Sequence, residues 1–260
     1  ELVTPEALRQ IIDGRRTSSS QLWAQMAELG FLSASIPEPY GGAGLGPCEA
    51  AVMLEEMGKH VAPVPYFPSI CGTAEAIMLA GSEDQKTYWL PKLASGEVIG
   101  TFAFSEGRSS LDPGSMTTVL AGTELSGSKM PVPEASSATL CVVATSRGGL
   151  SLVRMEQPQI SVTPLTGFDE LLSHSQVTFD RAAAEPLAGA DRDDMLSPLL
   201  DRMAIYQSFQ QIGGARAALE MARDFSLQRF IFGRPLASYQ ATKHKLAEIL
   251  IKLELARAHM

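Results

Sequence analysis

The sequence contains no asparagine and only three cysteines, and both scarcities exclude classes of protein. Without asparagine there is no N-glycosylation sequon. Cys48, Cys71 and Cys141 leave one thiol unpaired in any disulfide scheme, form no C-x-x-C pair and lack zinc-ligand spacing. We therefore expect free thiols in a reducing, cytoplasmic setting, and we exclude a disulfide-stapled domain and a structural zinc site.

Long hydrophobic runs are missing as well. The stretch 247–255 is interrupted by Glu248, Lys252 and Glu254, whereas a helix needs about 20 apolar residues to cross a bilayer. The acidic N-terminus does not have the pattern of a signal peptide. We expect neither a membrane span nor secretion.

Positive charge is also scarce, because 21 Lys and Arg stand against 29 Asp and Glu and leave a net charge of −8. Nucleic-acid binders carry a basic face, so we expect no nucleic-acid partner. The chain has no G-x-x-x-x-G-K-[ST], no G-x-G-x-x-G after a strand, no H-E-x-x-H and no G-x-S-x-G. Those absences argue against the common nucleotide, zinc-protease and serine-hydrolase sites.

What is present is 45% hydrophobic residues in 260, enough for large cores. Thr4-Pro5 and the Ser82 to Gln85 capping box predict helix starts in the first third. The middle third has short β-branched or aromatic runs between Gly, Pro and Ser, typical of antiparallel sheets. These runs are 98–104, 117–120, 140–144, 149–155, 160–164 and 173–179. Helical spacing returns over 197–228 and 239–260, around a turn at 232–235.

The predicted fold is therefore an α+β multidomain chain. It has an N-terminal α-helical domain (1–96), a central antiparallel β-barrel or sandwich (97–188) and a C-terminal α-helical bundle (189–260). We expect that bundle to be incomplete, because the last helix reaches residue 260 without a cap, Gly or Pro.

The glycine-rich run 41–46 allows two interpretations. Its backbone amides could cradle a phosphate, or it could simply turn the chain between two helices. On the run alone, the turn is the simpler interpretation.

Several motifs in collinear order resemble the acyl-CoA dehydrogenase family of flavoproteins over nearly the whole chain. Residues 29–44 are similar to its L-G-x₆-P-x-x-Y-G-G-x-G loop, which favours a structural role for the glycine run. Residues 85–97 keep the spacing of its Q-K-x₃-L-P-x-L-x-x-G-E segment. Residues 229–240 resemble its R-x-x-F-G-x-P-L-x-x-x-Q pattern at every fixed position.

This resemblance implies an FAD site in two parts. Phe104 and Ser105 belong to a segment similar to the first flavin loop, whose backbone and hydroxyl contact the isoalloxazine ring. Arg229, Phe232, Gly233 and Gln240 belong to a segment that in relatives reaches across a subunit interface to the FAD of the neighbour. There the arginine meets the pyrophosphate, which suits the paired donors of a guanidinium.

The sequence also departs from the family. The first flavin loop loses its Pro, its Gly and a second Ser over 105–112. In the second loop, over 129–134, Pro131 and Pro133 replace the family's Trp and Thr. The position of the catalytic Glu in some relatives is Met203 here, and Asp201 lies about 200° around the helix from it. We therefore leave the base unassigned, with Asp201 as the nearest carboxylate.

The resemblance implies α,β-dehydrogenation of an acyl-CoA thioester, with FAD as hydride acceptor. It also implies a homologous subunit in a homo- or hetero-tetramer, as in the mixed complexes of bacterial steroid side-chain degradation, and an electron-transfer acceptor. Two alternatives stay open. The chain is a non-catalytic subunit that completes the FAD site of a homologous chain, or it is a flavin-free acyl-CoA- or protein-binding descendant.

Overall fold

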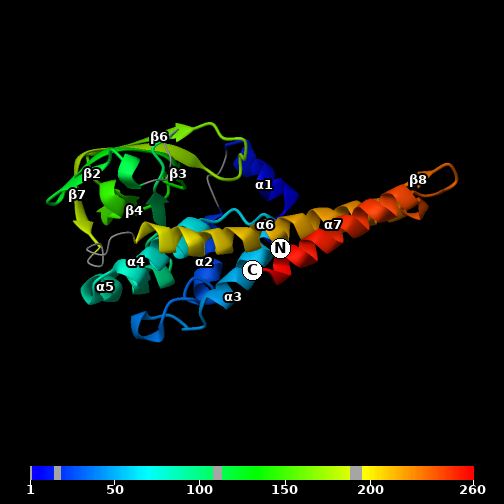
Figure 1. Ribbon diagram of the computed structural model, residues 1–260, viewed down its shortest axis with the longest axis horizontal. Helices are drawn as coiled ribbons and strands as arrows, with labels where there is room; N and C mark the ends of the chain where they lie inside the picture. The colour runs from blue at the N-terminus through cyan, green and yellow to red at the C-terminus, as the bar shows by residue number, and fades with distance from the viewer. Residues whose placement is uncertain (1, 15–18, 108–112, 188–194) are drawn as a thin grey trace. The chain divides into compact units, whose positions relative to one another are not determined.

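The computed structural model describes residues 2–14, 19–107, 113–187 and 195–260 (Figure 1). The chain forms two compact units. The first, which we call the sheet unit, comprises Glu1–Glu49 and Pro63–Met203, and the second, the helical unit, comprises Ala50–Ala62 and Ala204–Met260. The predicted division at 96 and 188 stays a prediction.

The helices of the sheet unit begin where local capping predicts. Helix α1 (Pro5–Ile12) starts behind Thr4, whose side chain accepts a hydrogen bond from the amide of Ala7. Helix α2 (Ser20–Glu28) is followed by Gly30 in the left-handed region, with φ of 79°. The capping box of Ser82 and Gln85 opens α5 (Glu83–Ala94), after the short α4 (Glu75–Ala80). The two helix starts predicted at Thr4-Pro5 and at Ser82 are confirmed.

A π-helical segment, η2 (Phe67–Ala74), precedes α4. Two of its buried hydroxyls bind the first strand, β1 (Gly100–Ala103). Ser69 Oγ accepts from the amide of Gly100 at 3.0 Å, and Thr73 Oγ1 donates to the carbonyl of Thr101 at 2.8 Å. Since β1 is an edge strand, these side chains satisfy backbone groups that the sheet leaves open.

Seven strands form one mostly antiparallel sheet. The other six are β2 (Val119–Ala121), β3 (Glu124–Pro133), β4 (Leu140–Ala144), β5 (Leu150–Arg154), β6 (Ile160–Leu165) and β7 (His174–Pro186). Their order is β1-β4-β5-β7-β3-β2, β6 pairs with β7, and β1 pairs with β4 in parallel. The antiparallel prediction is confirmed, but the described strands do not close into a barrel. One isolated bridge, between Glu106 and Met130, links the segment after β1 to β3.

Strand β3 is the element that sequence patterning did not predict. Gly127, Pro131 and Pro133 make this stretch read as a loop. The structure accommodates the prolines because the pairing of β3 with β7 shifts register between Lys129 and Val132. Proline is tolerated at such irregularities, where a ladder hydrogen bond is already missing.

The sheet unit buries two apolar clusters. One joins the helices to the sheet and contains Leu90, Leu140, Leu152, Phe104 and Met203, among others. The other contains Leu125, Val143, Val177 and Phe179. Phe104 is therefore part of a core, and its neighbour in sequence, Ser105, is held by that packing.

The helical unit contains residues 50–60 of α3 (Pro47–His60), residues 204–228 of α6 (Leu196–Gln228) and α7 (Gln240–Ala258). Helices α3 and α6 approach so closely that glycine is required at the crossing. A Cβ on Gly213 would lie 1.8 Å from the carbonyl oxygen of Glu55, and one on Gly58 would lie 1.9 Å from that of Gln210. The neighbouring Gly214 has more room, since its Cβ would lie 3.6 Å from the nearest atom.

A buried carboxylate ties the same helices together. Glu55 on α3 pairs with Arg257 on α7 at 3.0 Å and with Arg216 on α6 at 3.8 Å. Arg216 also reaches Glu254 at 2.6 Å. The predicted helical bundle is thus observed as a packed set of helices.

In the part of the chain that the structure describes, no helix is long and apolar enough to cross a membrane. The same residues contain no group of three or more His, Cys, Asp or Glu side chains placed to hold a metal ion.

Candidate functional site

The segment expected to contact a flavin ring follows β1. Phe104 is buried, and its ring lies 4.8 Å from that of Phe102, centroid to centroid. Ser105 is half-buried, and within the described ranges its hydroxyl makes a single long contact, 3.4 Å from the carbonyl of Gly107. That hydroxyl is therefore available to a ligand. The rest of the predicted loop, 108–112, lies outside the described residues.

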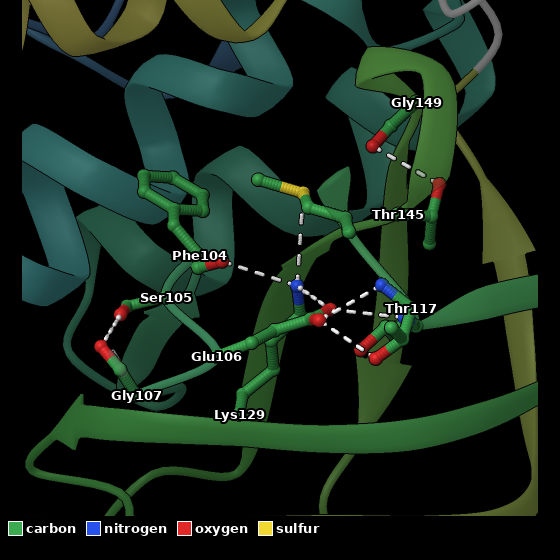
Figure 2. Close-up of polar contacts among 10 residues, drawn as sticks. Phe104, Ser105, Glu106, Gly107, Thr117, Lys129, Thr145 and Gly149 are labelled. Carbon is green, nitrogen blue, oxygen red and sulfur yellow. Dashed lines mark hydrogen bonds and ion pairs between the residues drawn. The ribbon is translucent and has the colours of Figure 1, made fainter. Parts of the chain in front are cut away.

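A buried ion pair underlies this segment (Figure 2). Lys129 on β3 is fully buried, and its Nζ donates to Glu106 Oε1 at 2.9 Å and to the carbonyl of Phe104 at 3.1 Å. Glu106 also accepts from the amide and hydroxyl of Thr117, at 2.8 and 2.7 Å, and from the amide of Thr118 at 2.9 Å. The pair therefore joins the loop after β1 to β3.

Burial and hydrogen bonding act in opposite directions on the pKa of Glu106. Burial alone would raise it, but the bonds from Thr117, Thr118 and Lys129 outweigh burial and lower the pKa. Burial lowers the pKa of Lys129, and Glu106 offsets part of that effect. Glu106 is thus an ionised, fully engaged group with a structural role. The sequence alone gave no signal for this pair, because Glu106 and Lys129 lie 23 residues apart in the chain.

The second ring segment lies at the end of β3. Pro131 is exposed, while Pro133 is half-buried and its carbonyl accepts a hydrogen bond from the Thr101 hydroxyl. Glu134 follows with φ of 51°, and its carboxylate accepts from the amide of Ser173 at 3.0 Å. Prolines at 131 and 133 offer neither an indole face nor a hydroxyl. Among the described residues of the two ring segments, a flavin ring would therefore be contacted by Ser105 and by backbone groups.

The segment expected to reach the phosphates is a hairpin between α6 and α7 (Figure 1). Strands β8 (Phe230–Ile231) and β9 (Arg234–Pro235) pair around Phe232 and Gly233. Both turn residues lie in the left-handed region, with φ of 49° and 75°, as a tight two-residue hairpin turn demands. The Phe232 side chain is 93% exposed, so it does not contribute to the core of this chain.

Arg229 and Gln240 flank this hairpin and are both exposed. Among the described residues, no hydrogen-bond or ion-pair partner of the Arg229 guanidinium is found. Gln240 is the first residue of α7, whose N-cap, Tyr239, makes no side-chain capping bond. A free guanidinium and uncapped amides suit phosphate oxygens. The hairpin therefore fits the diphosphate of FAD.

The six predicted flavin residues thus fall into two groups. Phe104 and Ser105 lie in the sheet unit, while Arg229, Phe232, Gly233 and Gln240 lie together at the hairpin of the helical unit.

The glycine-rich run 41–46 has a structural role. The amides of Gly41, Gly42, Ala43, Gly44 and Leu45 all donate to backbone carbonyls within residues 33–38. No amide of these five is left for a phosphate. This result favours the turn over the phosphate cradle.

Asp201 and Met203 lie on α6 as helical geometry predicts. Asp201 is exposed, whereas Met203 is buried in the core of the sheet unit. The position that carries a Glu in some relatives therefore holds an apolar core side chain. The structure therefore gives no support to Asp201 as the catalytic base.

Two family models match the chain. The acyl-CoA dehydrogenase N-terminal domain matches residues 3–97, and the acyl-CoA dehydrogenase C-terminal domain matches residues 195–260. Acyl-CoA dehydrogenase FadE12 of Mycobacterium tuberculosis is 32% identical over 263 residues, covering 92% of this chain and 66% of the relative. An acyl-CoA dehydrogenase of Bacillus subtilis is 32% identical, covering 91% of this chain and 68% of the relative. The chain thus spans about two thirds of these relatives.

Solved structures give the same result. A variant of the Tcur3481-Tcur3483 steroid acyl-CoA dehydrogenase superposes with a TM-score of 0.88 at 32% identity, over 97% of this chain and 70% of that one. The ChsE4-ChsE5 complex from Mycobacterium tuberculosis superposes with a TM-score of 0.86 at 26% identity, with the same coverage. Sequence motifs, fold and relatives agree, and the chain belongs to the acyl-CoA dehydrogenase family.

Proposed function

We propose that this chain is a subunit of an acyl-CoA dehydrogenase that uses FAD to introduce the α,β double bond of an acyl-CoA thioester. One observation carries the proposal: an exposed hairpin that presents Arg229, in the family's motif, without a partner among the residues that the structure describes. A helix-end arginine with a structural role would instead bind nearby carbonyls or carboxylates. Free Cys48, Cys71 and Cys141 support a reducing, cytoplasmic setting.

The residues would divide the work of holding FAD. Arg229 offers paired donors to the diphosphate, while Gln240 adds a side-chain amide and Gly233 an open backbone. Phe232 supplies an exposed aromatic surface, and Phe104 holds Ser105 in place so that its hydroxyl can donate to the ring. When bound, FAD accepts the hydride from the substrate. The carboxylate that takes the α proton is not assigned within this chain.

A specific observation favours a second candidate, in which the chain completes the flavin site of a homologous subunit. The hairpin keeps its phosphate-binding residues, whereas Pro131 and Pro133 remove two ring contacts from this chain's own site. The similarity to a two-component complex, ChsE4-ChsE5, supports a mixed tetramer with an acyl-CoA substrate and an electron-transfer acceptor. The retained hairpin argues against a flavin-free descendant.

Flavin content distinguishes the two candidates. We expect the chain purified alone to hold little FAD and co-expression with a homologous subunit to give a yellow complex. Absorbance at the flavin bands, divided by protein concentration, measures the stoichiometry. Stoichiometric, tightly bound FAD in the lone chain would overturn the mixed-complex candidate and leave the first one.

Arg229→Lys tests the phosphate contact itself. Lysine keeps the charge but lacks the paired, planar donors, so we expect flavin affinity to fall while the melting temperature stays unchanged. Arg223→Lys is the matched control, because Arg223 is an exposed arginine on α6, the helix that ends just before Arg229, and it pairs with Asp224 at 2.7 Å. Equal flavin affinity in both variants would show that Arg229 does not bind the phosphates and has a structural role instead.

A further inference from the structure

The hairpin has two chemically different faces. In paired strands alternate side chains lie on the same face, and Ile231 is opposite Arg234. The amide of Leu236 donates to the carbonyl of Arg229 at 2.7 Å, so the antiparallel pairing extends to residue 229. Arg229, Ile231 and Arg234 therefore share one face, and Phe230 lies on the other. Diagonal neighbours of this kind are about 7–8 Å apart.

Arg234 is held in place by an aromatic ring. Its guanidinium lies 3.9 Å from the centre of the Tyr239 ring, and the Tyr239 hydroxyl donates to the carbonyl of Ile231 at 2.8 Å. Tyr239 thus contacts both strands of the hairpin. A guanidinium stacked on a ring keeps its N–H groups in its own plane, so those donors stay free for an anion.

The local charge points to an anion as well. Residues 225–247 contain four Lys or Arg and no Asp or Glu, in a chain whose net charge is −8. In the described ranges none of these four cations, Arg229, Arg234, Lys243 and Lys245, forms an ion pair. An unneutralised positive segment on an acidic protein attracts a doubly charged ligand such as a diphosphate.

We propose that Arg234, stacked on Tyr239, is a second diphosphate-binding cation beside Arg229, and that Tyr239 is the residue that positions it. This inference rests on the proposed function and extends it. One guanidinium binds one phosphate group in a bidentate manner, and a diphosphate has two. Two guanidiniums on one face of a rigid hairpin match that ligand without the ordering cost of a flexible loop.

The test uses the assembly that binds FAD, with this chain as wild type or as Arg234→Met. FAD, ADP and riboflavin are titrated separately, because ADP has the diphosphate without the ring and riboflavin has the ring without phosphate. We expect the variant to bind FAD and ADP at least tenfold more weakly, as for one lost charge-assisted hydrogen bond. Riboflavin affinity should not change. Arg223→Met, which removes an equal charge from α6, should leave all three affinities within twofold.

Tyr239→Leu tests positioning. It should weaken FAD binding when Arg234 is present and add nothing to Arg234→Met, whereas a general structural role would lower affinity in both backgrounds. Additive losses would overturn the role of Tyr239, and an Arg234→Met variant that binds FAD and ADP like wild type would overturn the role of Arg234. Failure of the wild-type assembly to bind FAD or ADP would overturn the proposed function, and this inference with it.

Discussion

Lys129→Met is the substitution whose effect can be worked out most fully from the structure. It removes the cation that pairs with the buried carboxylate of Glu106 and keeps most of the apolar stem of the side chain. Breaking a buried pair in this way costs about 3–5 kcal/mol, because one charge stays buried without compensation. Glu106 keeps its three bonds to Thr117 and Thr118. We therefore expect a loss at the lower end of this range. The unfolding free energy at pH 7, measured by urea denaturation, should fall by about 3 kcal/mol.

The pH dependence separates charge burial from simple loss of packing. In the wild type the lowered pKa of Glu106 contributes stability above the unfolded pKa of about 4.3. That contribution is lost as the pH falls toward the folded pKa. Without Lys129 the pKa of Glu106 in the folded variant is higher than in the wild type. Acid therefore protonates the buried carboxylate of the variant at a higher pH and removes its uncompensated charge. The difference between variant and wild type should therefore be constant well above the unfolded pKa of about 4.3 and shrink as the pH falls below it.

Two further variants control this experiment. Lys92→Met removes a lysine whose 3.1 Å pair with Glu97 is exposed, and we expect a much smaller loss, because solvent screens that pair. Combining Lys129→Met with Glu106→Gln should recover part of the stability. A Lys129→Met loss that stays constant between pH 7 and pH 3, with no recovery in the double variant, would refute the ion-pair reasoning.

Three other predictions follow from the geometry. Gly213→Ala should lower the unfolding free energy by at least about 2 kcal/mol through overpacking, whereas Gly214→Ala should be neutral or stabilising by up to about 1 kcal/mol; equal urea midpoints for the two variants would contradict the close helix crossing. Asp201→Ala should leave acyl-CoA oxidation by the assembled complex nearly unchanged, and a drop of about a hundredfold or more with flavin still bound would identify Asp201 as the base. Thr73→Val should cost about 1–3 kcal/mol by leaving the carbonyl of Thr101 unsatisfied, with Thr73→Ser milder in thermal denaturation; a valine variant as stable as wild type would show that the π-helical hydroxyl is dispensable.

Local signals in the sequence predicted the helix starts and the candidate flavin residues. Thr4 and Ser82 cap their helices through hydrogen bonds within three residues, so neighbouring chemistry is enough to locate them. The pattern from Arg229 to Gln240 is equally local, since a two-residue turn requires Gly233. Strand β3 was missed because Pro131 and Pro133 signal a loop, and only pairing with a distant strand makes that stretch extended.

The sequence by itself thus determined the order of helical and strand segments, the family resemblance and the candidate flavin-binding residues, because all of these depend on short-range patterns. Tertiary structure decided the partners of each polar side chain. Lys129 pairs with buried Glu106, Arg234 stacks on Tyr239, and Arg229 has no partner within the described ranges. These outcomes depend on which strands pair and how tightly helices approach, and such long-range contacts leave no pattern within a single segment.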